Sequence, residues 1–324
     1  MYKVLVTARI FGKLSDDSFD IFKTAGFEIA NNPYRGKGLS ENQLIELIGG
    51  VHGLLTGVDK VTAKVINAAD ELKVISKFGT GVDNIDVAAA TQNGVVVTNA
   101  PGMNSDAVAD MTFALILSIA RRITFADDQV KKGNWPLIVG TEICNKTLGL
   151  IGLGEIGKRV ALRAGGFSMK ILTHEVLPDE QFIQKHRIER VSLNRLLQES
   201  DFVSIHVPLT AETKALIKTE QLEMMKPTAF LINTARGGIV DEKALHDILQ
   251  SRKIAGAAFD VFKEEPLRER DLLKLDNFIV TPHISPFTRE AIENTEKLSA
   301  QNIIDVLMGQ PSPFVVNPEV LGEK

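Results

Sequence analysis

The chain has 324 residues and a formal net charge of −4, and 44% of its residues are hydrophobic while 24% are charged. This length and composition predict about two globular domains, and the small negative charge provides no general attraction to nucleic acid or to an anionic membrane. The single cysteine, Cys144, excludes an intrachain disulfide and a cluster of thiolate ligands, and we expect no metal site.

The first residues, MYKVLVTARIFG, lack the cationic lead and long apolar core of a signal peptide. The most apolar stretch, residues 113–120, is far shorter than the roughly 20 residues that a membrane span needs. The sequence therefore predicts a cytoplasmic protein.

The first hundred residues alternate short apolar runs with amphipathic stretches, which is the pattern of βαβ units around a parallel sheet. This part is expected to form one small doubly wound domain. Its expected strands lie at 4–6, 27–29, 53–55, 74–75 and 95–97, and its expected helices at 15–24, 41–48 and 63–69.

The sequence Asn-Ala-Pro-Gly at 99–102 interrupts this pattern and indicates a domain boundary. A densely apolar helix is expected at 105–122, then a polar, irregular segment at 123–146, then a second βαβ series from Thr147 to about Pro286. A final helix at 290–308 has no strand after it and is expected to return to the first unit. The predicted domains are therefore 1–100 plus 287–324, for the substrate, and 101–286, for a dinucleotide.

The most informative stretch is residues 146–161, KTLGLIGLGEIGKRVA, in which an apolar strand runs into a glycine-rich turn and a helix. Gly152 permits the tight turn, Gly154 lets the backbone approach a pyrophosphate, and Gly157 allows close packing of helix on strand. The helix amino terminus adds free amides and a positive dipole. A GxGxxG pattern alone is a weak signal, but its place between strand and helix predicts dinucleotide binding.

Two further residues refine this prediction. Glu175 follows the next apolar run, 23 residues after Gly152, and a carboxylate there binds a ribose diol and repels a 2′-phosphate, which favours NAD over NADP. Arg159 stands where a P-loop needs serine or threonine, so the magnesium ligand of a nucleotide hydrolase is missing.

Ligands of open α/β sheets bind beyond the carboxyl ends of the strands. Each charged residue that follows a later apolar run would, alone, be an ordinary loop residue. Together, beside a dinucleotide, they provide a cation for a carboxylate, an imidazole for proton exchange and a carboxylate to orient that imidazole. These residues are Arg236, Asp260, Glu265 and His283.

With these residues the chain resembles the NAD-dependent D-2-hydroxyacid dehydrogenases over nearly its whole length, and most closely the short phosphoglycerate dehydrogenases without a C-terminal regulatory domain. The family implies a flavodoxin-like substrate domain and a Rossmann domain that binds NAD. The motifs that carry the resemblance are GTGVDNID (79–86), NAPGMNSDAVAD (99–110), GLGEIG (152–157), NTARGGIVDE (233–242), DVFKEEP (260–266) and TPHIS (281–285).

The resemblance implies that Arg236 binds the substrate carboxylate and carbonyl, that His283 is the acid/base, and that Glu265 pairs with His283. Asp260 is implied to hold the nicotinamide carboxamide. The implied cofactor contacts are Gly152, Gly154, Glu155, Ile156, Gly157, Glu175, Pro208, Thr234, Ala235, Arg236, Asp260 and His283. The implied substrate contacts are Lys77, Thr80, Gly81 and Arg236.

The expected reaction interconverts a D-2-hydroxy acid and its 2-keto acid. The pair that the resemblance favours is D-3-phosphoglycerate and 3-phosphohydroxypyruvate, in serine biosynthesis. One departure concerns the phosphate: members that act on phosphoglycerate often carry an arginine after the third strand, where residues 55–59 here have none, and Lys77 is the alternative cation. A glyoxylate or hydroxypyruvate reductase, or a general D-2-hydroxyacid dehydrogenase, remains an alternative, and a dinucleotide-sensing corepressor a remoter one. The family implies a homodimer, with its contact at 105–146.

Overall fold

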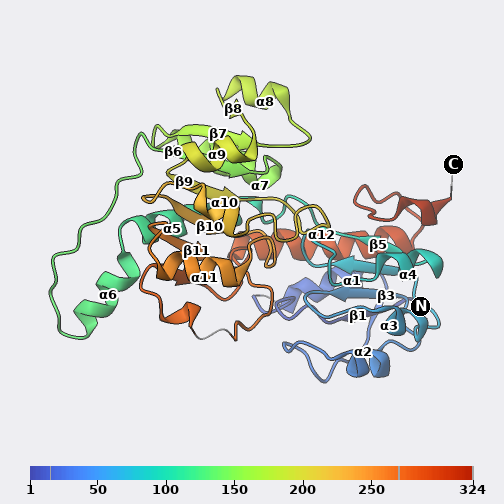
Figure 1. Ribbon diagram of the computed structural model, residues 1–324. Helices are drawn as coiled ribbons and strands as arrows, with labels where there is room; N and C mark the ends of the chain where they lie inside the picture. Colours follow the sequence, from blue (N-terminus) through green and yellow to red (C-terminus); the bar gives the residue numbers. More distant parts are fainter. Residues whose placement is uncertain (15, 269–270, 323–324) are drawn as a thin grey trace. The chain divides into compact units, whose positions relative to one another are not determined.

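The computed structural model describes residues 1–14, 16–268 and 271–322 (Figure 1). The chain forms two compact units, residues 1–104 with 287–324 and residues 105–286. Each unit contains one parallel sheet, so the predicted class of two doubly wound α/β domains is confirmed.

The sheet of the first unit has the strand order β2-β1-β3-β4-β5, which is the flavodoxin-like order. All of its strand pairs are parallel, for example Val4 with Gly53 and Gly53 with Val74. The sequence prediction of five short apolar strands is confirmed. The strands are β1 (Lys3–Val6), β2 (Glu28–Ile29), β3 (Gly53–Thr56), β4 (Val74–Lys77) and β5 (Val96–Thr98).

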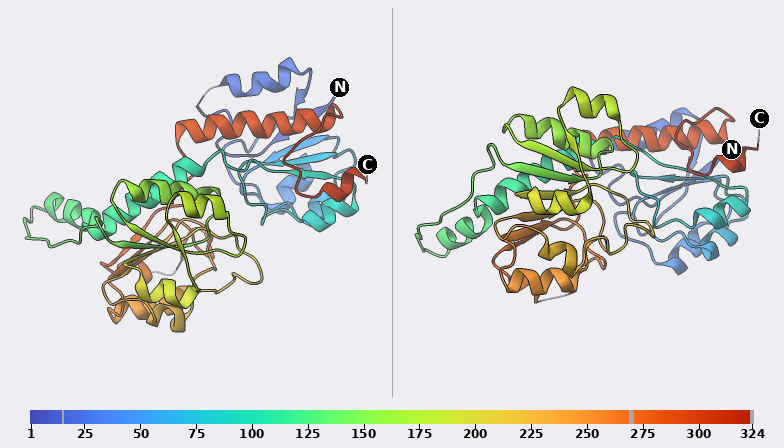
Figure 2. Two further views of the ribbon diagram at one scale, coloured as in Figure 1. Left: turned by 90° about the horizontal axis from the view of Figure 1, so that it is seen from above. Right: turned by 45° about the horizontal axis from the view of Figure 1, so that its top comes forward.

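Helices cover both faces of this sheet, because alternate strand residues are apolar on each side. Leu5, Leu54 and Ile75 pack against α2, α3 and α4, whereas Val4 and Val74 pack against α1 and the long carboxyl-terminal helix α12. Figure 2 shows α12 lying along one face of the sheet. The expected helix at 15–24 begins at Asp16 in the structure, since Ser15 lies outside the described residues, and α4 was not predicted. The elements are η1 (Asp16–Phe19), α1 (Asp20–Thr24), α2 (Glu41–Leu47), α3 (Ala63–Asn67), α4 (Val87–Gln92), α12 (Arg289–Leu307) and η3 (Pro318–Leu321).

The second unit has the strand order β12-β11-β10-β9-β6-β7-β8, in which the chain reverses direction across the sheet between β6 and β9, as in a Rossmann domain. Its central strands are buried on both faces and read as largely apolar runs, whereas the short edge strand β8 is charged and partly exposed. They are β6 (Thr147–Ile151), β7 (Lys170–His174), β8 (Glu189–Arg190), β9 (Phe202–Ile205), β10 (Phe230–Asn233), β11 (Gly256–Phe259) and β12 (Phe278–Val280).

The helices of the second unit form a layer on each side of its sheet. The helices α5 and α7 pack on one side, against Leu150 and Phe202, and α9, α10 and α11 pack on the other, against Val203 and Leu231. The helices are α5 (Ser105–Ala120), α7 (Glu155–Gly165), α8 (Glu180–Lys185), α9 (Leu193–Glu199), α10 (Thr219–Glu223) and α11 (Glu242–Gln250), with the short turn η2 (Leu272–Lys274).

The segment after α5 differs from the prediction of an irregular stretch, because residues Ile123–Lys131 form the helix α6. No side chain of α6 is buried, and polar residues make up more than half of the segment, which is why the sequence predicts a polar, irregular stretch. Lys131 pairs with Asp127 at 2.6 Å and Lys132 with Asp128 at 2.7 Å, and such i,i+4 pairs support a solvated helix. Figures 1 and 2 show α6 and the chain after it extending away from the sheet of the second unit.

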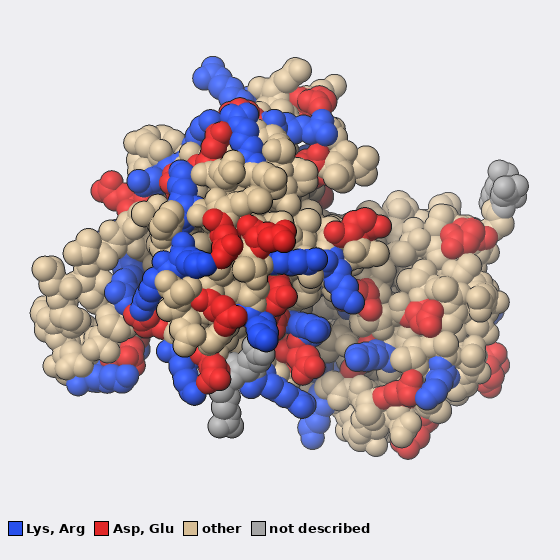
Figure 3. Space-filling model, in the orientation of Figure 1, with Lys and Arg blue, Asp and Glu red and all other residues tan. Residues whose placement is uncertain are grey.

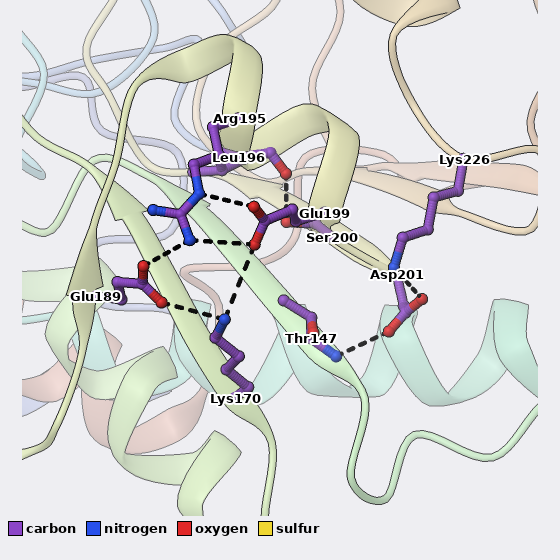
Figure 4. Close-up of polar contacts among 9 residues, drawn as sticks. All are labelled: Thr147, Lys170, Glu189, Arg195, Leu196, Glu199, Ser200, Asp201 and Lys226. Carbon is purple, nitrogen blue, oxygen red and sulfur yellow. Dashed lines mark hydrogen bonds and ion pairs between the residues drawn. The ribbon is translucent and has the colours of Figure 1, made fainter.

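A network of charged side chains lies where the strands of this sheet begin (Figure 4). Arg195 contacts Glu189 and Glu199, each at 2.6 Å, and Lys170 lies 3.1 Å from Glu189. These contacts join β7, β8 and α9 at the edge opposite the strand ends that carry Arg236 and His283. We therefore infer that these ion pairs stabilise the fold and are not part of the candidate site.

Positive and negative side chains are intermixed over the face of the molecule in Figure 3, as the small net charge leads us to expect. Among the described helices, none is both long enough and apolar enough to cross a membrane.

Candidate active site

Glu265 and His283 form the central pair of the candidate site. Glu265 Oε2 lies 2.8 Å from His283 Nδ1, although 18 residues separate the two in sequence. His283 follows β12, and Glu265 follows the neighbouring strand β11, so the parallel register brings both to the same edge of the sheet. About a third of each side chain remains exposed, which leaves the pair accessible to a small molecule.

Burial tends to raise the pKa of Glu265, but the hydrogen bond and charge of His283, the amide of Phe262 and the charge of Arg236 together lower that pKa below its ordinary value. Glu265 is therefore ionised at neutral pH. Because an ionised carboxylate only accepts, Nδ1 of His283 carries a proton and donates to it. Nε2 is then the ring nitrogen that gains and loses a proton.

Arg236 lies just beyond the end of β10, in a loop held by Asn233. The Asn233 side chain accepts from the amide of Ala235 at 3.0 Å and donates to the carbonyl of Arg236 at 2.9 Å. The guanidinium of Arg236 donates to the carbonyl of Ala235 at 2.7 Å. Asn233 was not singled out in the sequence, although its position directly before Thr-Ala-Arg-Gly-Gly at a strand end was a usable signal.

Gly237 brings the arginine loop against the loop that carries Glu265. A Cβ atom at Gly237 would lie 1.9 Å from the carbonyl carbon of Phe262 and 2.3 Å from the amide nitrogen of Lys263. The amide of Phe262 donates to Glu265 Oε1 at 3.0 Å. Only glycine permits this approach, so the position of Glu265 depends on the absence of a side chain at 237.

Asp260 is fully buried at the end of β11 and holds the loop that carries His283. Its carboxylate accepts from the hydroxyl of Thr281 at 2.5 Å, from the amide of Ile284 at 2.9 Å and from the amide of Ser285 at 2.8 Å. His283 itself has a φ of 56°, in the left-handed region that residues other than glycine seldom adopt.

The glycine-rich turn between β6 and α7 fits a bound pyrophosphate. Gly152 has a φ of 96°, and a Cβ on it would meet the carbonyl oxygen of His206 at 2.8 Å, while a Cβ on Gly157 would meet the carbonyl oxygen of Gly152 at 2.5 Å. A Cβ on Gly154 would meet nothing within 4 Å, so space is left beside the turn rather than filled by the protein. No side chain caps the amino terminus of α7, where Glu155 and Ile156 present their amides.

The other residues expected to contact the cofactor lie around this turn and along the same sheet edge. Glu175, after β7, accepts from the amide of Leu153 in the turn at 2.6 Å and from the amide of Leu177 at 2.9 Å. Its contact with a ribose diol stays a prediction. Pro208 is exposed after β9. Thr234 is buried, and its hydroxyl lies 3.0 Å from that of Thr112 on α5, so this hydroxyl points to the helix.

His206, which lies between β9 and Pro208, packs against the glycine-rich turn at Gly152 and Gly157. Its Nε2 lies 2.9 Å from the Ser204 hydroxyl, and its Nδ1 is a buried nitrogen without a hydrogen-bond partner. Burial lowers the pKa of His206 to about 3, so the imidazole is neutral at physiological pH. It serves as packing beneath Gly152 and Gly157 and not as an acid or base.

In the first unit, the residues expected to contact the substrate lie at the end of β4 and in the loop after it. Lys77 is buried, and its ammonium donates to the carbonyl of Gly57 and, at 2.7 Å, to Asn84 Oδ1. This cation is engaged within its own unit, where it ties together the loops after β3 and β4. Thr80 is exposed, and Gly79 has a φ of 127°, which places the backbone of this loop in a conformation that favours glycine.

Within residues 1–14, 16–268 and 271–322, no group of three or more His, Cys, Asp or Glu side chains is placed to hold a metal ion.

Comparison with known proteins places this geometry in a family. Residues 113–285 match the model of the D-isomer specific 2-hydroxyacid dehydrogenase NAD binding domain. The chain is 44% identical to a glyoxylate reductase of Thermococcus litoralis, over 86% of this chain and 87% of that protein. It is 41% identical to a D-3-phosphoglycerate dehydrogenase of Methanocaldococcus jannaschii over 100% of this chain but 61% of that longer protein.

A solved structure agrees with both matches. The D-lactate dehydrogenase of Aquifex aeolicus, complexed with NAD and lactic acid, is 31% identical, and its fold superposes with a TM-score of 0.84 over 97% of this chain and 98% of that chain.

Proposed function

This chain belongs to the D-isomer-specific 2-hydroxyacid dehydrogenases, which are NAD-dependent enzymes acting on a CH–OH group, and we propose that Arg236, Glu265 and His283 carry out its reaction. The observation that carries the proposal is the 2.8 Å contact of Glu265 with His283, in a loop that adjoins the loop of Arg236. When bound, NAD would provide the hydride acceptor for oxidation at C2 of the hydroxy acid, and NADH the hydride donor for reduction of the keto acid.

The protein's own groups perform the binding and the proton transfer. The guanidinium of Arg236 binds the substrate carboxylate and polarises the carbonyl that is reduced. His283, through Nε2, donates a proton to the carbonyl oxygen in reduction and removes the hydroxyl proton in oxidation. Glu265 holds Nδ1–H, which orients the ring and stabilises its charged form.

The cofactor is held by the glycine-rich turn, by the free amides of Glu155 and Ile156, and by Glu175 at the ribose. The loop of Ala235 and Arg236, which follows β10, lies at the same edge of the sheet. In the first unit, the backbone at Thr80 and Gly81 is proposed to meet the substrate carboxylate.

For the substrate, we propose a small unphosphorylated 2-keto acid, such as glyoxylate or hydroxypyruvate. The loop at 55–59 lacks the arginine that phosphoglycerate enzymes often use to bind the phosphate. The alternative cation, the ammonium of Lys77, already donates hydrogen bonds to Gly57 and Asn84, so it is not available for a phosphate. The similarity to glyoxylate reductases over most of both chains supports the same choice.

D-3-phosphoglycerate remains the second candidate, and with it a role in serine biosynthesis, because a phosphoglycerate dehydrogenase is 41% identical over the whole of this chain. The test is the initial rate of NADH oxidation with glyoxylate, hydroxypyruvate and 3-phosphohydroxypyruvate. We expect kcat/KM for the unphosphorylated acids to exceed that for the phosphorylated one at least 10-fold. The reverse preference would establish phosphoglycerate as the substrate and require a phosphate contact other than Lys77.

We further propose that the protein acts in the cytoplasm as a homodimer. Residues 135–139, which follow α6, expose three large apolar side chains, Trp135 at 88%, Leu137 at 95% and Val139 at 83%. An apolar group of this kind on an extended segment is typical of a surface that another chain covers, and a second copy of this chain is the occupant that the family implies.

A further inference from the structure

The loop that carries His283 is held by a single buried side chain. Asp260 accepts three hydrogen bonds, and all three donors belong to residues 281–285. One donor, the Thr281 hydroxyl, lies before His283, and the other two, the amides of Ile284 and Ser285, lie after it. Asp260 therefore clamps the loop on both sides of His283.

The clamp surrounds a residue whose backbone is unfavourable. His283 has a φ of 56°, and a non-glycine residue in this region costs free energy that the surrounding contacts must supply. The contact of Nδ1 with Glu265 at 2.8 Å depends on this conformation, because it sets the direction of the side chain. Loss of the clamp would let the backbone of His283 relax toward negative φ, which non-glycine residues favour, and this would redirect the ring.

The donors are not equivalent. Ile284 and Ser285 contribute backbone amides, which any residue except proline provides, so only the Thr281 contact depends on a side chain. Oδ1 accepts from both Thr281 and Ile284, whereas Oδ2 accepts from Ser285 alone. A carboxylate oxygen accepts two hydrogen bonds, so Oδ1 is filled and Oδ2 keeps one position for a further donor.

We propose that Thr281, acting through Asp260, is a positioning residue that fixes His283 against Glu265 for proton transfer. The proposal rests on the proposed role of His283 and adds to it a residue that touches neither substrate nor cofactor. It also assigns the buried carboxylate of Asp260 a main role in holding the histidine loop.

The test compares Thr281→Val, which removes the hydroxyl and keeps the shape, with Thr281→Ser, which keeps the hydroxyl and removes the methyl group. We expect kcat to fall by on the order of 10- to 100-fold in Thr281→Val, since small displacements of a catalytic group have effects of this size, and to stay within about 3-fold of wild type in Thr281→Ser. The Kd for NADH, from its fluorescence, should change less than about 3-fold in both. The high-pH limb of kcat for reduction should move to lower pH in the valine variant only.

Hydrogen exchange of the amides of Ile284 and Ser285 gives a readout without turnover. In Thr281→Val both should exchange at least about 10-fold faster, because the clamp is loosened, and in Thr281→Ser their rates should stay near wild type. If Thr281→Val does not fold, Thr281→Ala replaces it, with the same expectations.

The proposal would be overturned if Thr281→Val kept the wild-type kcat, pH profile and amide exchange rates. It would also be overturned if kcat fell equally in Thr281→Ser, because the effect would then come from packing of the methyl group. His283→Ala separates this result from the proposed function. Wild-type-like turnover in His283→Ala would remove the catalytic role itself, whereas an inactive His283→Ala beside a fully active Thr281→Val would refute only the positioning role.

Discussion

The residue on which the two catalytic loops depend most directly is Gly237. A methyl group there would overlap the backbone of Phe262 and Lys263, so Gly237→Ala must push the Glu265 loop away from His283. We expect kcat to fall at least about 100-fold, because the acid/base and its partner separate, while the Kd for NADH changes little. Steady-state kinetics and NADH fluorescence check this, and Gly165→Ala, where no atom lies within 4 Å of the added carbon, is the matched control.

His283→Ala removes the group that we propose transfers the proton. We expect kcat to fall by about 100- to 10,000-fold, the usual contribution of a positioned acid/base, with NADH binding nearly unchanged because the turn at 152–157 is intact. Turnover is measured by NADH oxidation and binding by fluorescence titration. Activity near that of wild type would contradict the mechanism.

Glu265→Gln keeps the size of the side chain and removes its charge. An ionised carboxylate favours the charged imidazole that donates the proton in reduction, and an amide does not. The high-pH limb of kcat for reduction should therefore move to lower pH, while the rates well below that limb stay closer to wild type. A pH profile that does not move would remove Glu265 from this role.

At the scale of single elements, the end of β9 makes stability depend on pH through His206. The unfolded chain binds a proton on this histidine near pH 6.5, but burial holds the pKa of the folded ring at about 3. The unfolded state therefore binds more protons between these values, and the free energy of unfolding falls as pH drops from 6.5 toward 3. By pH 5 the loss is about 2 kcal/mol.

His206→Gln should remove this loss. Urea denaturation at pH 7 and at pH 5 measures the difference in unfolding free energy for wild type and variant. His186→Gln, on the carboxyl end of α8, is the control and should keep the wild-type difference. If His206→Gln loses as much stability as wild type between the two pH values, the ring is not held neutral in the folded protein.

At the scale of the whole molecule, the exposed segment around Trp135 predicts self-association. Trp135 is the only tryptophan, so its emission reports directly on whether this segment is covered. We expect wild-type protein to elute as a dimer at micromolar concentration and its emission to shift to the red on dilution, as Trp135 meets water. The double variant Trp135→Ser, Leu137→Ser should elute as a monomer, and a monomeric wild type would contradict the dimer.

The fold class, the glycine-rich turn and the candidate residues Arg236, Glu265 and His283 could all be predicted from the sequence. These follow from local information, because strand and helix periodicity, glycine spacing and the residues after each apolar run are all read within a few residues. Parallel pairing then makes the strand ends adjacent, so short-range patterns predicted a long-range site. The helix α6 was not predicted because its segment is mostly polar and none of its side chains is buried.

The sequence could not show which charged side chains form hydrogen bonds with other parts of the chain, and this came from the tertiary structure. Lys77 looks like a free cation in sequence, but contacts with Gly57 and Asn84 occupy it. Asp260 reads as one more carboxylate at a strand end, but its partners are residues 281–285. Hydrogen bonds of this kind join residues far apart in the chain, and their geometry depends on backbone conformation and burial, which no local pattern of residue types specifies.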